Sequence, residues 1–238
     1  MKKSGKALLM MLSAAALVVT TVFGTIAYFT DSEGVVNTFT VGQVHLGLDE
    51  ADVKPDGTYE TDAAGNKLDR VLANVYHLIP GQTYVKDPTV HVTAGSEDCY
   101  VFVTVDNQIA DIEWNDDDTY KSIKEQMNDK GWEELKDNGE TVVTGENELT
   151  VYVYYDSSKQ SNVVSKSDTV TNLVVFEEFK IDGNNVISSD IADEELDNMF
   201  YLDDYSTKKI MVNAYAVQAA GFDSALEAWN ATYGKSSN

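Results

Sequence analysis

The sequence predicts a mainly β protein, an antiparallel β-sandwich domain with short inserted helices and one helix near the C-terminus. Three segments alternate their side chains with a period of two residues and are rich in β-branched and aromatic residues, which is the pattern of β-strands. Both faces of these segments are apolar, which is typical of strands covered on two sides or of the inner strands of a sandwich. The three segments are residues 99–106, 149–155 and 210–217.

The beginning of the chain has the parts of a secretory signal peptide. Lysines near the start precede an uncharged run over 7–23, and small residues follow as far as Ala27. We expect a signal peptide over 1–27, cut between Ala27 and Tyr28, and a single domain over 28–238. Contact with the membrane is then expected only before cleavage. A retained membrane anchor is the alternative, but the run is short for a helix that spans a bilayer.

Charge and cysteine content narrow the class of protein. The whole chain carries a formal net charge of −23, and the leader contains three lysines and no acidic residue. Removal of the leader takes the net charge to −26, which argues against binding to nucleic acid or to anionic lipid. Cys99 is the only cysteine, so no intrachain disulfide can form. We expect Cys99 to be a small buried hydrophobic residue and not a catalytic thiolate.

The segment that begins the mature chain, residues 28–48, is apolar for a free end. Its alternation slips in phase at Gly42 and Gln43, which indicates a β-bulge or a bend between two sheets. Such a segment fills a groove, either in its own domain or in a neighbouring copy. Addition to a neighbour's sheet joins copies head to tail without closing a ring, and so it builds filaments. The residues expected to form this assembly strand are Tyr28, Phe29, Val35, Val36, Phe39 and Val41.

Two further segments, 85–92 and 172–181, are weaker strand candidates. Pro88 interrupts the first of them, and proline is confined to edge strands and strand ends because it lacks a backbone N–H. We therefore predict that Pro88 marks either an edge strand or the entry to a strand, and 85–92 is a candidate for the edge to which an added strand pairs. Residues 49–70 combine scattered acidic residues with proline and glycine, and they predict a long loop or hairpin.

Helical spacing occurs in a few short stretches. The apolar residues of 119–129 recur at helical intervals and predict a short helix. A second helix is expected at 225–233, where Ser224 and Glu227 have the spacing of a capping box. A helical turn is also predicted at 191–199. These helices are expected to decorate one β domain, because no linker divides the chain.

No residue pattern points to a catalytic site. The sequence lacks a His-Glu-x-x-His helix, a Gly-x-Ser-x-Gly elbow and a phosphate-binding loop. The acidic runs at 52–62 and 116–118 do not follow the EF-hand ligand order, so solvated loops are the simpler interpretation. We expect no cofactor and no catalytic residue. Calcium or zinc is a weak alternative, with His77, His91, Asp116 and Asp118 as candidate ligands.

Motifs at both ends and in the middle of the chain resemble the TasA/camelysin family of Gram-positive bacteria. Gly-Thr-Ile-Ala-Tyr-Phe-Thr-Asp at 24–31 resembles the family's leader cleavage pattern, and Asn-Thr-Phe-Thr-Val-Gly follows it at 37–42. Lys-Asp-Pro-Thr-Val at 86–90, Asp-Cys-Tyr-Val-Phe-Val at 98–103 and the pattern over 210–222 are similar to the clostridial branch of the family.

The resemblance implies a jelly-roll β-sandwich that is secreted to the extracellular matrix or the cell surface of a Gram-positive bacterium. It implies a structural subunit of biofilm-matrix fibres, in which the N-terminal segment of one copy adds as a donor strand to the next. A SipW-type signal peptidase would release that segment, and a matrix accessory protein is a further expected partner. The alternatives are a camelysin-like extracellular metallopeptidase, although this chain lacks a zinc-ligand motif, and a monomeric surface-binding module for calcium or glycan.

Overall fold

A computed structural model describes residues 44–114, 120–187 and 199–234 of the chain. All of these residues belong to one compact unit, Val35–Asn238. This described part is mainly β, with mostly antiparallel pairing and two short α-helices, so the predicted fold class is confirmed and is consistent with a β-sandwich. None of the described helices combines the length and the apolar character that a membrane crossing needs.

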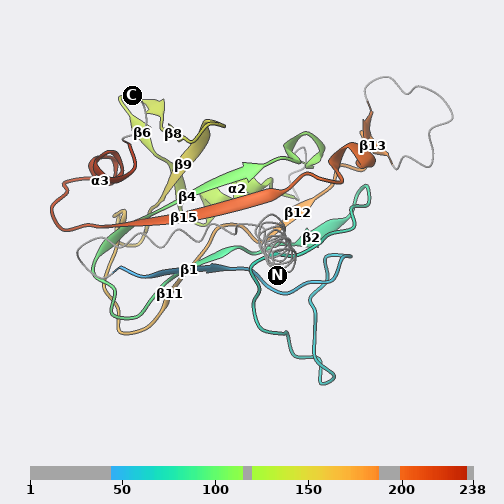
Figure 1. The fold of residues 1–238 in the computed structure, drawn as a ribbon, viewed down its shortest axis with the longest axis horizontal. Helices are drawn as coiled ribbons and strands as arrows, with labels where there is room; N and C mark the ends of the chain where they lie inside the picture. Colours follow the sequence, from blue (N-terminus) through green and yellow to red (C-terminus); the bar gives the residue numbers. More distant parts are fainter. Residues whose placement is uncertain (1–43, 115–119, 188–198, 235–238) are drawn as a thin grey trace, which may run out of the picture. The chain divides into compact units, whose positions relative to one another are not determined.

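The larger sheet is built around β4. Strand β15 pairs with β4 in antiparallel register over its whole length, from Ile210 opposite Asn107 to Gln218 opposite Cys99. On its other side β4 pairs with β9 and β10, and β9 extends the sheet to β5 and β8. Figure 1 shows β15 alongside β4. The strands of this sheet are β4 (Cys99–Asn107), β5 (Trp132–Glu134), β8 (Val143–Thr144), β9 (Leu149–Tyr154), β10 (Val163–Val164) and β15 (Ile210–Gln218). The three segments predicted from their period of two residues are β4, β9 and β15, so all three are confirmed as strands.

A second, three-stranded sheet contains β1 (Leu46–Asp49), β3 (Thr89–Val92) and β11 (Thr171–Val174). Strand β3 lies in the centre, because it pairs with β1 on one side and with β11 on the other. Three two-stranded pairs complete the described strands. They are β2 (Thr83–Val85) with β12 (Glu178–Lys180), β6 (Lys136–Asp137) with β7 (Glu140–Thr141), and β13 (Val186–Ile187) with β14 (Phe200–Tyr201).

The prediction that 85–92 is a peripheral acceptor edge was wrong, whereas the alternative that Pro88 marks the entry to a strand is confirmed, because β3 begins at Thr89. Pro88 lies between two short strands, β2 and β3, so its missing N–H removes no hydrogen bond from either ladder. Its carbonyl accepts a hydrogen bond from the N–H of Val175 at 2.8 Å. Both sides of β3 are already paired, and 85–92 therefore has no room for an added strand.

Strand β4 separates two hydrophobic cores. Val101 and Val103 face the first core, which also contains Val90 of β3. Phe102 faces the second core, where its ring centroid lies 5.1 Å from that of Trp229 on helix α3 (Ala225–Thr232). This arrangement explains why both faces of the strand are apolar. Cys99 is fully buried in the first core, and burial raises the pKa of its thiol to about 12, as expected for a packing residue.

The two α-helices begin at capping residues that the sequence contains. Helix α2 (Ile123–Asp129) starts after Ser122, whose side chain forms a reciprocal capping box with Glu125. The helix therefore begins later than the predicted boundary, although it ends where it was expected. Helix α3 starts after Ser224, as predicted, and the Ser224 hydroxyl accepts a hydrogen bond from a first-turn N–H. Two 3-10 helices, Ala110–Ile112 and Leu202–Tyr205, are also present, and most of the predicted turn at 191–199 lies outside the described residues.

We expect alanine to be far less tolerated at Gly57 than at Gly65. Both glycines have positive φ, 78° and 85°, but a Cβ on Gly57 would lie 2.6 Å from a ring carbon of Tyr84, whereas one on Gly65 would meet nothing within 4 Å. Gly65→Ala should cost about 1 kcal/mol of unfolding free energy, and Gly57→Ala about 2 kcal/mol more, because Tyr84 must move. Urea unfolding measures both losses, and equal losses would contradict the close packing of Gly57 on Tyr84.

Candidate assembly site

The outer edge of β15, the side turned away from β4, is the longest strand edge without a partner in the described part of the chain. Two hydrogen bonds fix the orientation of its backbone: Gln108 N–H donates to the carbonyl of Lys209, and Ala219 N–H donates to the carbonyl of Asp98. Because antiparallel pairs alternate, odd-numbered residues of β15 turn their N–H and C=O groups toward β4. Even-numbered residues, from Ile210 onward, turn theirs toward the outer edge.

The two halves of this edge differ. The Tyr233 hydroxyl, just after α3, donates to the carbonyl of Ala216 at 3.3 Å and so occupies one outward-facing group in the C-terminal half of the edge. Ile210, Val212 and Ala214 have no strand beside them in residues 44–114, 120–187 and 199–234. Their side chains pack against the first hydrophobic core, so the backbone they carry is held in a strand conformation. A preformed strand with an open edge is a template for another strand.

Strand β1 brings the N-terminal segment close to β15 without pairing with it. It is an edge strand of the three-stranded sheet, and its Cα atoms come within 8 Å of those of β15 (Figure 1). Val44 is buried where the chain joins the domain. The expected cleavage and assembly residues lie outside the described residues, so their placement stays a prediction. These residues are Ala27, Tyr28, Phe29, Val35, Val36, Phe39 and Val41.

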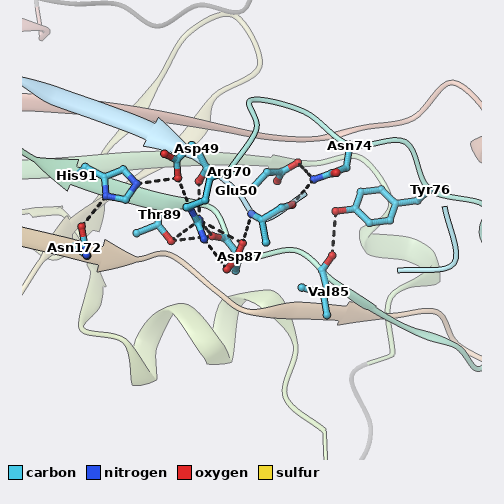
Figure 2. A network of polar contacts seen from close by, with 11 residues as sticks. Asp49, Glu50, Arg70, Asn74, Tyr76, Val85, Asp87, Thr89, His91 and Asn172 are labelled. Atoms are coloured by element: carbon cyan, nitrogen blue, oxygen red, sulfur yellow. Dashed lines mark hydrogen bonds and ion pairs between the residues drawn. The ribbon is translucent and has the colours of Figure 1, made fainter. Parts of the chain in front are cut away.

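A network of polar contacts around Arg70 holds the end of β1 to the start of β3 (Figure 2). The guanidinium contacts the Asp49 carboxylate through Nε, and Nη1 donates to Asp87 Oδ2 at 3.0 Å. Nη2 donates to the Thr89 hydroxyl at 2.9 Å. Charge-assisted bonds from one planar guanidinium to two carboxylates fix geometry as well as adding energy. The network therefore pins the segment that carries Arg70 to the three-stranded sheet.

The charges in this network reinforce one another. Burial disfavours the ionised form of Asp49, but hydrogen bonds and the charges of Arg70 and His91 outweigh it, so the pKa of Asp49 is lowered. Burial also opposes the charge on Arg70, but the carboxylates of Asp87 and Asp49 outweigh it and raise the pKa of Arg70. Beside them, Glu50 is buried and accepts from Lys86 Nζ at 2.5 Å. Each buried charge here is thus paired, as a stable interior requires.

The candidate metal ligands do not form a metal site in the described part of the chain. His91 Nε2 lies 2.8 Å from Asp49 Oδ1, and its Nδ1 lies 2.7 Å from Asn172 Oδ1, so both ring nitrogens are engaged. His77 is exposed on a loop. Residues 44–114, 120–187 and 199–234 hold no group of three His, Cys, Asp or Glu side chains able to bind a metal. Asp116 and Asp118 lie outside these ranges, so their role stays a prediction.

Acidic residues of the loop after β1 are used locally. Asp56 accepts hydrogen bonds from the N–H and the hydroxyl of Thr58, and Asp62 accepts from the N–H groups of Ala64 and Asn66. These bonds close tight turns, which is the ordinary use of aspartate in a loop. Residues 52–62 therefore form tight turns with their own acidic side chains, and calcium binding there stays an untested alternative.

Two features of the site were missed by the sequence analysis. Arg70 is the only arginine in a chain with 40 acidic residues. This fact could have identified it in the sequence as a residue that forms a structural ion pair. The open edge of β15 had no comparable signal, because edge and central strands differ in what lies beside them and not in their own sequence. Comparison with known proteins gives no match: no family model, no curated protein and no solved structure corresponds to this chain.

We expect Asp49→Asn to destabilise the protein at neutral pH and to flatten its acid response. A carboxylate whose pKa is lowered by folding stabilises above its unfolded value of about 3.8 and loses that contribution as the pH falls through its folded value. At pH 7 the unfolding free energy of the variant should be about 1 kcal/mol below that of wild type. Between pH 4 and pH 2 the unfolding free energy should fall less for the variant than for wild type. Urea unfolding at several pH values tests this, with Asp69→Asn as the control because the Asp69 side chain forms no hydrogen bond or ion pair within the described ranges. Identical pH profiles for wild type and Asp49→Asn would contradict the expected role.

Proposed function

We propose that this protein is a secreted structural subunit of extracellular or biofilm-matrix fibres. In this proposal a signal peptidase cuts after Ala27, and the freed N-terminal segment of one copy adds as a strand to the outer edge of β15 in the next copy. The observation that carries the proposal is the edge at Ile210, Val212 and Ala214, which no strand of the described residues covers, on a strand fixed by a hydrophobic core. The family resemblance of the sequence supports the same function.

The composition of β15 supports a role in pairing. Proteins usually protect an exposed strand edge with lysine, proline, a bulge or a charged side chain. Strand β15 carries none of these residues over Ile210–Gln218. An uncharged edge beside a buried core gives an incoming strand both backbone hydrogen bonds and an apolar surface.

Head-to-tail addition explains how such a subunit would form fibres. The donor segment and the acceptor edge are different surfaces of one chain, so each copy donates to one neighbour and accepts from another. A contact of this kind leaves both ends of the assembly open, and it produces a filament unless the rotation closes a ring. An uncut leader would hold the donor segment at the membrane, so cleavage would switch assembly on.

We expect Val212→Pro to abolish fibres while the domain stays folded. Proline removes the one N–H that Val212 turns toward the outer edge and leaves the hydrogen bonds to β4 in place. Val212→Ala is the matched control, because it removes side-chain contacts in the core but keeps the N–H. Electron microscopy of the protein purified after export should show fibres for Val212→Ala and none for Val212→Pro, with cooperative thermal unfolding in both.

Deletion of residues 28–37 provides the complementary test on the donor side. The deletion leaves the described domain intact and should also prevent fibre formation. Fibres that persist in both the deletion variant and Val212→Pro would overturn the proposed assembly.

A further inference from the structure

The segment at residues 72–79 exposes several apolar side chains. Strand pairing at the outer edge of β15 does not explain why they are exposed. Leu72 is 58% exposed, Val75 is 79% exposed and Ile79 is 44% exposed. Together these three residues form the exposed row. Single exposed apolar residues are common, but several in one short segment mark an interaction surface.

Intervening side chains fix this segment to the domain. Asn74 Nδ2 donates to Glu50 Oε1 at 2.8 Å, and the Tyr76 hydroxyl donates to the carbonyl of Val85 at 3.0 Å (Figure 2). Leu78 packs against the first hydrophobic core. The exposed row is therefore held by ordered neighbours, and a partner that binds it does not have to order the segment first.

The backbone of the segment has open hydrogen-bonding groups. The N–H of His77 donates to the carbonyl of Pro55 at 2.7 Å, and the N–H of Ile79 donates to the Tyr84 hydroxyl at 2.6 Å. From Leu72 to Tyr76, no backbone N–H has a partner within residues 44–114, 120–187 and 199–234. Open amides next to exposed apolar side chains suit an extended partner that pairs through its main chain.

Charge identifies the kind of partner. Residues 71–85 contain no Asp, Glu, Lys or Arg, in a chain that has 40 acidic residues. A patch without charge attracts neither a basic nor an acidic surface, so an apolar segment of low charge fits it best. Most of the N-terminal segment has that character, because 34–48 is uncharged, and the aromatic pair Tyr28 and Phe29 precedes the two acidic residues Asp31 and Glu33.

The position of the segment suits the same donor that pairs with β15. Residues 79–82 are connected through β4 to the Ile210 end of β15. A series of contacts makes this connection: Ile210 pairs with Asn107, Asn107 bonds to Glu113, Glu113 bridges Ile181, and Ile181 bonds to Gln82. The residues at 28–43 span about 50 Å when extended, which exceeds the length of the open edge and leaves chain that extends beyond it.

The chain joins the domain at the other end of β1. His45 bonds to Thr93 and Ser96, whereas Glu50, just beyond the far end of β1, pairs with Val71 at the start of the segment. The donor segment of a copy thus leaves from one end of β1 and the exposed row lies near the other. This separation is what head-to-tail contact between two copies requires.

We propose that residues 72–79 receive the leading end of the N-terminal segment of a second copy, with Tyr28 and Phe29 packed on the exposed row. The inference rests on the proposed function and adds a second contact to it. The outer edge of β15 supplies the main strand pairing, and the exposed row anchors the aromatic end of the same donor.

Cross-linking between two copies tests the contact directly. One copy carries Phe29→Cys and the other, distinguished by a size tag, carries Val75→Cys; buried Cys99 is left in place. A short bismaleimide should give a mixed dimer at about ten times the yield obtained when Val75→Cys is replaced by Val170→Cys. Val170 is a suitable control because it is 50% exposed. Equal yields would overturn the inference, and so would a single chain with both cysteines that links only to itself at every protein concentration.

An assembly assay separates this inference from the proposed function. Val75→Asp should raise the concentration needed for fibres about tenfold, whereas Val170→Asp, which adds the same charge elsewhere, should change it less than twofold. Both positions are exposed, so thermal unfolding should be unchanged. Wild-type fibres with no difference between the two variants would refute the role of 72–79 alone. A wild-type protein that forms no fibres would refute the proposed function and this inference with it.

Discussion

A β-strand carries hydrogen-bonding groups along both of its edges, and each group that is removed from water needs a partner. In the described part of the chain, β15 satisfies one edge completely through β4 and satisfies the other only where Tyr233 reaches Ala216. The open part of the edge cannot relax into another conformation, because Ile210, Val212 and Ala214 are fixed against the hydrophobic core. An added strand would satisfy the remaining groups without any change in the domain, and the account of assembly depends on this constraint.

The rest of the architecture keeps the edge and the segment 72–79 in place. Two cores on opposite faces of β4 make the larger sheet rigid, with Phe102 and Trp229 in contact on one side and Val101 among the buried residues on the other. The Arg70 network holds the loop after β1 to the three-stranded sheet through two carboxylates. A chain with a single cysteine has no intrachain disulfide to do this, and the partly buried ion pair of Arg70 with two carboxylates fixes the loop instead.

The sequence was informative where local chemistry decides the structure. Period-two patterns identified β4, β9 and β15, and Ser224 followed by Glu227 identified the start of α3, whereas helical spacing found α2 but placed its start too early. It was misleading at Pro88, because the effect of a proline depends on whether its position lies inside a ladder, and that depends on pairing between distant segments. The Arg70 network joins residues 17 and 21 positions apart, and it extends to His91 through a contact that spans 42 positions. No local pattern contains such contacts, and the same limit hid the open edge of β15.

Amide hydrogen exchange at Val212 and Ala214 is the most direct measurement of the central claim. If a strand from a second copy pairs with β15, these two amides should exchange quickly in the dilute monomer and slowly in the assembled protein, while the β4-facing amide of Asn213 stays protected in both. Strong protection of Val212 and Ala214 in the monomer, or rapid exchange in the fibre, would contradict the account.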